Sequence, residues 1–250
     1  MRKILIVVGF IMLVLSGCAG LSGGGEEEKR VRTLGVVPIL VDADSIDYSA
    51  RAELTAMLVK SAANIDNLLV EQLRKKGDYF DVRLIDVPYG NLYEQIVIVR
   101  EKAGEGDASY NAYAYNPEMV TRLANDNLVD AVLVVVINGI TRSEKRWKEG
   151  PFSLDFLEAD YRSLLYSAAV VAPPSEQLWV REHRPGSVFL RLDYPDFSEA
   201  YWNKTEQVRI KEVTLSGLER TLLEPETGST TSRVYNDMVR DLVGDLKRGM

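Results

Sequence analysis

The chain has one cysteine and one histidine among its 250 residues, and these two side chains limit the chemistry that it can perform. Cys18 ends the stretch Leu-Ser-Gly-Cys, so the only thiol follows two small residues. A Ser–His or Cys–His nucleophile would have to use His183. That histidine lies in a charged stretch that leads into Pro-Gly, so we interpret it as a surface or turn residue.

The first residues have the order of an export signal. Arg2 and Lys3 precede an apolar run over residues 4–15, and small residues follow that run. The run is shorter than the ~20 apolar residues of a transmembrane helix. Residues 15–18 closely resemble the lipobox of bacterial lipoproteins, which implies cleavage before Cys18 and a diacylglyceryl group on its sulfur. An ordinary secretory signal and a short membrane anchor are the alternatives.

We therefore predict a signal peptide at residues 1–17, a lipidated tether at 18–30 and a compact α/β domain at 31–250. The tether is predicted from three glycines followed by three glutamates, which have nothing to bury. In well-studied Gram-negative cells an Asp after the lipidated cysteine favours the inner membrane. The resemblance therefore implies that Ala19 directs this chain to the outer membrane, facing the periplasm, with several acyl chains such as palmitate.

The charge balance argues against nucleic acid as a partner. Removing residues 1–17 takes away two basic residues, so the 30 basic and 37 acidic residues of the whole chain become 28 and 37, a formal charge of −9. Binding to a phosphate backbone depends on clustered Lys and Arg. The one short basic stretch, 142–148, is interrupted by Glu144, and we predict a solvated loop there.

The sequence contains few of the side chains that bind metals and cofactors. Zinc and haem normally take His or Cys, so we predict no metal and no cofactor. Asp42, Asp44 and Asp47 stand in one predicted loop, but their spacing lacks the alternating frame of a calcium-binding EF-hand. The sequence also lacks Gly-x-Ser-x-Gly, His-Glu-x-x-His and a phosphate-binding glycine loop, so we predict a protein that is not an enzyme.

Hydrophobic patterns predict the elements of the domain. Apolar or alternating runs predict strands at 31–41, 80–87, 130–140, 161–171, 178–182 and 188–192. Steps of three and four predict helices at 49–76, with a kink or break near 64–67, at 117–128, around 210–222 and at 234–246. Segment 92–102 fits either a helix or a strand, and 104–116 is predicted as a loop. The order predicts an α/β (α+β) fold, with helices packed on a mixed β-sheet.

Two groups of aromatic residues are candidate contact sites. Tyr110, Tyr113 and Tyr115 stand in the predicted loop, and Tyr201 and Trp202 belong to a second cluster. Aromatic side chains on loops serve as partner anchors or stack on sugars. The alternative, which we favour, is that they cover the core of their own domain.

The pattern as a whole resembles the periplasmic α/β domain of several bacterial lipoproteins. Besides the lipobox, the resemblance rests on the opening Leu-Gly-Val-Val-Pro-Ile-Leu at 34–40, the long helix before Tyr-Phe-Asp-Val at 79–82, the strand Asp-Ala-Val-Leu-Val at 130–134, and the pair that ends in Leu-Trp at 178–179. It covers about residues 31–223. The similar proteins include the curli-secretion-channel lipoprotein, lipoprotein activators of penicillin-binding proteins, and the N-terminal domain of TolB.

The resemblance implies a function in binding rather than in catalysis. We expect a membrane-anchored envelope lipoprotein that acts as a binding, assembly or accessory factor for an envelope protein complex, or that assembles with itself. The alternative is a lipoprotein that binds or hydrolyses peptidoglycan or another glycan.

Overall fold

The computed structural model describes residues 31–87, 91–147, 156–181, 183, 187–202 and 207–246. Residue contacts divide the chain into two units, Met1–Val31 and Arg32–Met250. The second unit has the predicted mixed α/β fold, and only this unit is described below. Cys18 and the predicted signal peptide and tether lie outside the described residues.

Seven strands form the main sheet of the described residues, and most of its strands lie in the order β3-β1-β6-β7-β8. Their bounds are β1 Thr33–Val36, β2 Leu40–Asp42, β3 Asp81–Leu84, β6 Ala131–Trp147, β7 Phe156–Ala172, β8 Glu176–Val180 and β9 Leu190–Arg191. The strand predicted at 31–41 is divided into β1 and β2, which both pair with β6 in parallel on either side of an interruption at residues 37–39 that contains Pro38. Strand β3 is parallel to β1, whereas β7 is antiparallel to β6.

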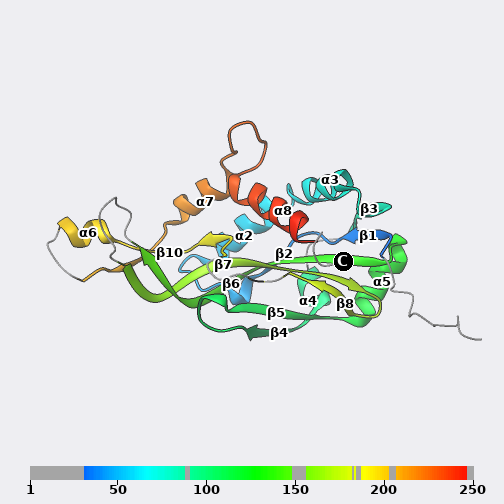
Figure 1. Cartoon of the computed structure of the whole chain (residues 1–250), viewed down its shortest axis with the longest axis horizontal. Helices are drawn as coiled ribbons and strands as arrows, with labels where there is room; N and C mark the ends of the chain where they lie inside the picture. Colours follow the sequence, from blue (N-terminus) through cyan, green and yellow to red (C-terminus); the bar gives the residue numbers. More distant parts are fainter. Residues whose placement is uncertain are drawn as a thin grey trace, which may run out of the picture. The chain divides into compact units, whose positions relative to one another are not determined.

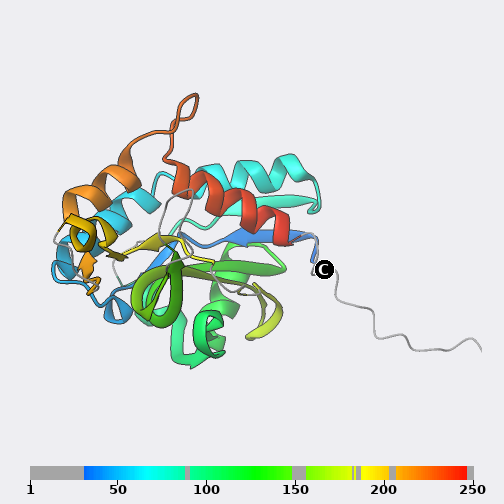
Figure 2. The same ribbon diagram turned by 60° about the vertical axis from the view of Figure 1, so that its left-hand side comes forward.

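The strand predicted at 130–140 is the first half of β6 and lies at the centre of the sheet, the position that a continuous run of β-branched residues favours. Every residue from Ala131 to Ile137 is fully buried. Val132, Val134 and Val136 belong to a hydrophobic cluster with α4, α5 and β5 on one face. The alternate residues of the strand point to the opposite face, which α2, α3 and α8 cover (Figures 1 and 2).

The helices of the described residues are α2 Arg51–Ala62, α3 Asp66–Lys76, α4 Leu92–Ile96, α5 Pro117–Asn127, α6 Phe197–Trp202, α7 Leu215–Leu223 and α8 Arg233–Leu246. Helices α2, α3, α5, α7 and α8 lie close to predicted helices, α4 lies in the segment that fitted either a helix or a strand, and α6 was not predicted. The predicted break near 64–67 separates α2 from α3. Helix α3 ends at Gly77, whose φ of 78° is the left-handed cap expected there. Within the described ranges, no helix has both the length and the apolar character that crossing a bilayer needs.

Three local predictions need correction. Segment 92–102 is a helix followed by a strand, α4 and then β4 (Val97–Ala103). The predicted loop at 104–116 contains strand β5 (Tyr110–Tyr115), which pairs with β4. Asn111, Tyr113 and Tyr115 occupy every second position and are buried, and the polar Asn111 hid this period of two. The helix predicted around 210–222 is preceded by a short strand, β11 (Ile210–Glu212), which pairs with β10 (Asp193–Pro195).

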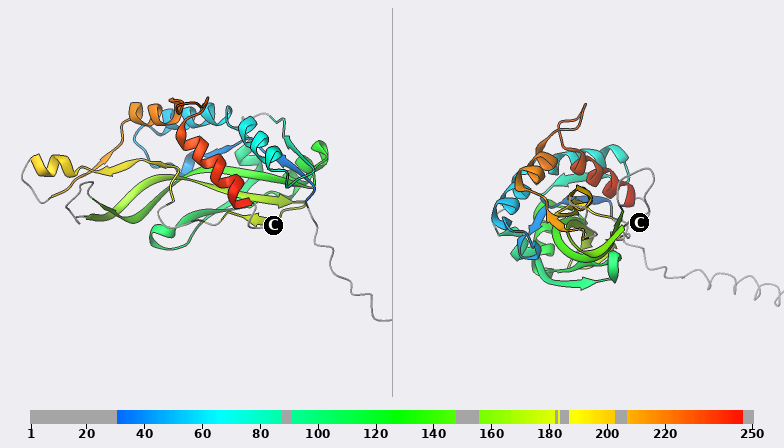
Figure 3. Two further views of the ribbon diagram at one scale, coloured as in Figure 1. Left: turned by 45° about the horizontal axis from the view of Figure 1, so that its top comes forward. Right: turned by 90° about the vertical axis from the view of Figure 1, so that its left-hand side faces the viewer.

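The largest difference from prediction is the length of the hairpin between β6 and β7. The two strands pair continuously from Val132↔Val171 to Trp147↔Phe156, so residues 142–147 belong to a strand and not to a solvated loop. At ~3.3 Å per residue, the 17 residues of β6 span about 55 Å. The outer half of this hairpin, residues 141–147 and 156–163, is called the arm below. It extends toward α6, at the end of the unit opposite to the start of β1 (Figures 1 and 3).

Candidate binding site on the arm

The arm begins where the side chains of β6 change from apolar to polar and charged. From Thr141 onward, exposed and buried residues alternate along the strand, and the buried ones are Arg142, Glu144 and Arg146. Residues two apart on a strand point to the same face. The buried face of this half of β6 is therefore made of charged side chains.

Glu144 joins the two arginines into one ionic ladder. Its Oε1 lies 2.7 Å from Nε of Arg142, and its Oε2 lies 3.1 Å from Nε of Arg146. The guanidinium of Arg146 also lies over the ring of Tyr161, at 3.8 Å from its centroid. Burial lowers the pKa of Arg146, and the neighbouring Glu144 opposes that change. A buried carboxylate with two arginine partners is satisfied, and one positive charge remains on the ladder.

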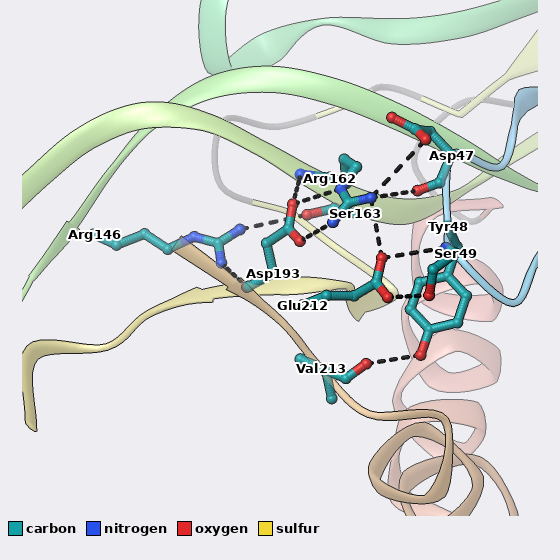
Figure 4. Close-up of polar contacts among 9 residues, drawn as sticks. All are labelled: Asp47, Tyr48, Ser49, Arg146, Arg162, Ser163, Asp193, Glu212 and Val213. Carbon is teal, nitrogen blue, oxygen red and sulfur yellow. Dashed lines mark hydrogen bonds and ion pairs between the residues drawn. The ribbon is translucent and has the colours of Figure 1, made fainter. Parts of the chain in front are cut away.

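A second ionic group, centred on Arg162 of β7, attaches the β10–β11 ribbon to the arm (Figure 4). Asp193 accepts three hydrogen bonds from Arg162: from the backbone N–H at 2.8 Å, from Nε at 2.9 Å and from Nη2 at 2.6 Å. Nη1 of Arg162 lies 3.1 Å from the Glu212 carboxylate. The hydrogen bonds to Asp193 raise the pKa of Arg162. Such a fork is rigid because Arg and carboxylate meet at two points.

The same group reaches the loop before α2. Glu212 accepts hydrogen bonds from the backbone N–H and the hydroxyl of Ser49, and Tyr48 donates its hydroxyl proton to the carbonyl of Val213 at 2.7 Å. Arg146 meanwhile donates to the backbone carbonyl of Asp193. Arm, ribbon and loop are thus held together by side chains from three separate parts of the sequence (Figure 4).

A pocket of about 590 Å³ lies along the arm, and it presents charges of both signs together with an indole ring. It is lined by Gly106, Asp107, Ser143, Glu144, Lys145, Arg146, Trp147, Glu158 and Arg191. Lys145 pairs with Glu158 at 3.4 Å across the two strands. Arg191 is exposed at this pocket, and no ion pair joins it to another of the described residues.

Two aromatic side chains stand at the outer end of the described arm. Trp147 is 56% exposed and Phe156 is 45% exposed, and their ring centroids lie 5.0 Å apart. The ammonium of Lys145 lies 5.3 Å from the centroid of Phe156. An exposed aromatic pair with an adjacent cation is typical of a recognition surface.

His183 is half-buried rather than fully exposed on a turn. Its ring stacks on Tyr110 at 4.4 Å, and burial, with Arg181 and Arg142 nearby, lowers its pKa to about 4. Nε2 lies 3.5 Å from the hydroxyl of Ser167, but that hydroxyl donates to the carbonyl of Asn111 at 2.8 Å. The serine proton is therefore directed away from the imidazole, and the pair is not arranged as nucleophile and base.

The predicted tyrosine contact site is divided between the interior and the edge of the domain. Tyr113 and Tyr115 are buried, in agreement with the interpretation that these residues cover the core. Tyr110 is half-buried against His183. Tyr201 and Trp202 belong to α6, but their side chains lie outside the described residues.

The acidic loop does not assemble a calcium site. Asp42 is buried, where it binds Nη1 of Arg100 at 2.9 and 3.0 Å and accepts a hydrogen bond from Tyr113 at 2.9 Å. Asp44 and Asp47 are exposed. Among the described residues, no group of three His, Cys, Asp or Glu side chains is placed to hold a metal ion.

The sequence analysis missed the residues that build the arm. Arg142, Glu144 and Arg146 do occupy every second position, which was the available signal. No family model matches this sequence, and no curated protein matches it either.

Proposed function

We propose that this chain is a lipid-anchored protein of the bacterial cell envelope that acts by binding, with the arm as its contact surface. The observation that carries the proposal is the exposed pair Trp147 and Phe156 at the outer end of the β6–β7 hairpin, whose other end lies in the core. A surface held by buried ion pairs loses little conformational entropy when it binds, because its geometry is already set.

The lipid anchor supports the same function. A diacylglyceryl group on Cys18 would confine the domain to a membrane surface and raise its effective concentration for a neighbour there. At this higher effective concentration, a weak contact through the arm is enough to keep the partner bound. The partner in this proposal is an envelope protein, or a second copy of the chain, which acts with this one as an assembly or accessory factor.

Photo-crosslinking in intact cells tests the proposal. A photoreactive amino acid at position 147 should give one discrete adduct, and the substitution Phe156→Ser should weaken it several-fold without changing the melting temperature. Ile98 is the matched control, because it is also 56% exposed but lies on β4. Equal adducts from positions 98 and 147, or none from 147, would remove the arm from the proposal.

A second candidate, binding to peptidoglycan or another glycan, is favoured by the pocket. Trp147 and Arg191 line it together, and indole rings stack on sugars while guanidinium groups bind carboxylates. Sedimentation of the purified protein with insoluble peptidoglycan measures this directly. Trp147→Ala and Arg191→Ala should each reduce the bound fraction, whereas unchanged sedimentation in both variants would exclude the pocket.

A further inference from the structure

The end of the domain opposite to the arm carries the two most exposed large apolar side chains of the described residues. Phe80 is 88% exposed and Leu128 is 76% exposed. Phe80 directly precedes β3, and Leu128 lies three residues before β6. Because β3 and β6 are the two neighbours of β1, both side chains flank the start of β1. The backbone N–H of Phe80 donates to the carbonyl of Arg32 at 2.8 Å, which places it beside the first residues of the domain.

Leu128 has an unusual backbone conformation for its residue type. It caps α5 with a φ of 53°, in the left-handed region where Gly or Asn is the ordinary choice. Within the described residues it is the one non-glycine with a positive φ. A leucine there is unfavourable for two reasons: its Cβ is strained at a positive φ, and its apolar side chain is exposed to water. Such an outlier points to a contact that the isolated domain does not show.

Three aspartates next to these side chains are already paired. Asp130 accepts hydrogen bonds from the backbone of Arg32 and from the backbone and hydroxyl of Thr33, at 2.8 to 2.9 Å. The carboxylates of Asp81 and Asp78 form ion pairs with Arg83 and Lys76, at 2.6 and 3.0 Å. These pairs reduce the repulsion that free carboxylates would meet at an anionic surface.

The covalent chain brings this end near the lipidated cysteine. Fourteen residues, 19–32, join Cys18 to the start of β1, and at 3.3–3.6 Å per residue they span at most about 50 Å. The start of β1 therefore cannot lie farther than that from the sulfur that would carry the acyl chains, and the arm lies at the other end of the domain (Figure 1).

We propose that Phe80 and Leu128 insert into the lipid surface to which Cys18 is anchored, and so orient the domain with its arm away from the membrane. This inference rests on the proposed lipid anchor. The occupant is the bilayer interface rather than a protein, because the start of β1, which these two side chains flank, is joined by 14 residues to the cysteine that we propose to be acylated. Two apolar side chains add to an anchor without replacing it, since stable attachment needs several acyl chains.

Single-cysteine labelling tests the orientation on the full lipidated chain. Cys18 is the only cysteine, and lipidation consumes its thiol, so each introduced cysteine is the only free one. Phe80→Cys and Leu128→Cys report on the proposed contact. Ser198→Cys, at an exposed position of α6 at the opposite end, is the control. Each variant is labelled with a nitrobenzoxadiazole dye and reconstituted in vesicles of phosphatidylethanolamine and phosphatidylglycerol, with or without brominated acyl chains.

The probes at positions 80 and 128 should be blue-shifted and should be quenched several-fold more by brominated lipid than the probe at 198. Flotation of the vesicles is read first. If the protein floats with them but all three probes are quenched equally, the anchor stands and the orientation is wrong. If the lipidated chain does not float, both the anchor and the orientation are wrong. Iodide in the aqueous phase should show the reverse order of quenching.

Discussion

The fork between Arg162 and Asp193 gives the sharpest stability prediction. Asp193 is 2% exposed, whereas the side chain of Arg162 retains 26% of its accessible surface and a second partner, Glu212, at 3.1 Å. Replacing Arg162 by Ala leaves a buried carboxylate with one backbone N–H. Replacing Asp193 by Ala leaves a partly hydrated cation that is still paired. The two substitutions should therefore differ although they break the same contact.

The magnitudes follow from what each substitution leaves behind. Removing one partner of a buried pair costs about 3–5 kcal/mol, and Arg162→Ala should lie in that range. Asp193→Ala loses three hydrogen bonds to a carboxylate, each of them charge-assisted at about 1.5–3 kcal/mol. Glu212 and solvent recover part of that loss, so we expect about 3 kcal/mol. The double variant should cost less than Arg162→Ala alone, because the second substitution removes the buried carboxylate that the first one leaves unpaired.

Urea unfolding followed by tryptophan fluorescence measures these differences, on a Cys18→Ala background that avoids the lipid. The exposed pair Arg240–Asp237, with side chains 71% and 40% exposed, is the control, and Arg240→Ala should cost less than about 1 kcal/mol. A larger cost for Asp193→Ala than for Arg162→Ala would refute the reasoning. Costs near the control for both would show that the ribbon is held by other contacts.

Three further predictions concern single positions. The pKa of His183 is about 4 in the folded chain and ~6.5 in the unfolded chain, so the unfolded state binds more protons between these values. The unfolding free energy should therefore fall by up to about 3 kcal/mol from pH ~6.5 to pH ~4. Thermal unfolding across that window should show this loss, and the His183→Phe variant should not show it. A Cβ on Gly139 would lie 2.5 Å from the Ser45 carbonyl oxygen, so Gly139→Ala should lower the unfolding free energy by about 1–3 kcal/mol in urea unfolding. The matched change Gly244→Ala, with nothing within 4 Å, should be neutral or raise it by up to about 1 kcal/mol, and equal effects would contradict the close approach. Leu128→Gly should raise the melting temperature by relieving the positive φ, a gain of about 0.5–1 kcal/mol, and a lower melting temperature would place the side chain in the core.

The central part of the fold could be predicted because its signals are local. The β-branched run at 131–137 has no polar residue that a buried strand would reject. Gly77 and the three cations before it define a helix end without reference to anything distant. In these segments, hydrophobic burial and backbone preference favour the same structure, and so the pattern alone is sufficient.

The arm could not be predicted because hydrophobicity carries no signal there. Arg142, Glu144 and Arg146 alternate with Thr, Ser and Lys, so both faces of the strand look polar in sequence. What makes one face buried is the set of partners, and Asp193 lies 47 residues beyond Arg146. The pairing of Asp42 with Arg100 and Tyr113 is hidden for the same reason, since it joins residues 58 and 71 positions apart. A charge ladder becomes recognisable only when the folded chain brings its partners together.

Strand β6 also determines how the domain would respond to a mechanical load. A partner that pulls the arm outward pulls β6 and β7 together along their own axis. The hydrogen bonds of β6 to β1 and β2, and of β7 to β8, run across that axis. They would therefore be loaded in shear, all at once, instead of opening one after another. Since no loop or hinge separates the arm from the core, displacement at Trp147 reaches Ala131 through a single continuous strand. Tension applied to the arm is therefore transmitted directly to the most deeply buried part of the sheet.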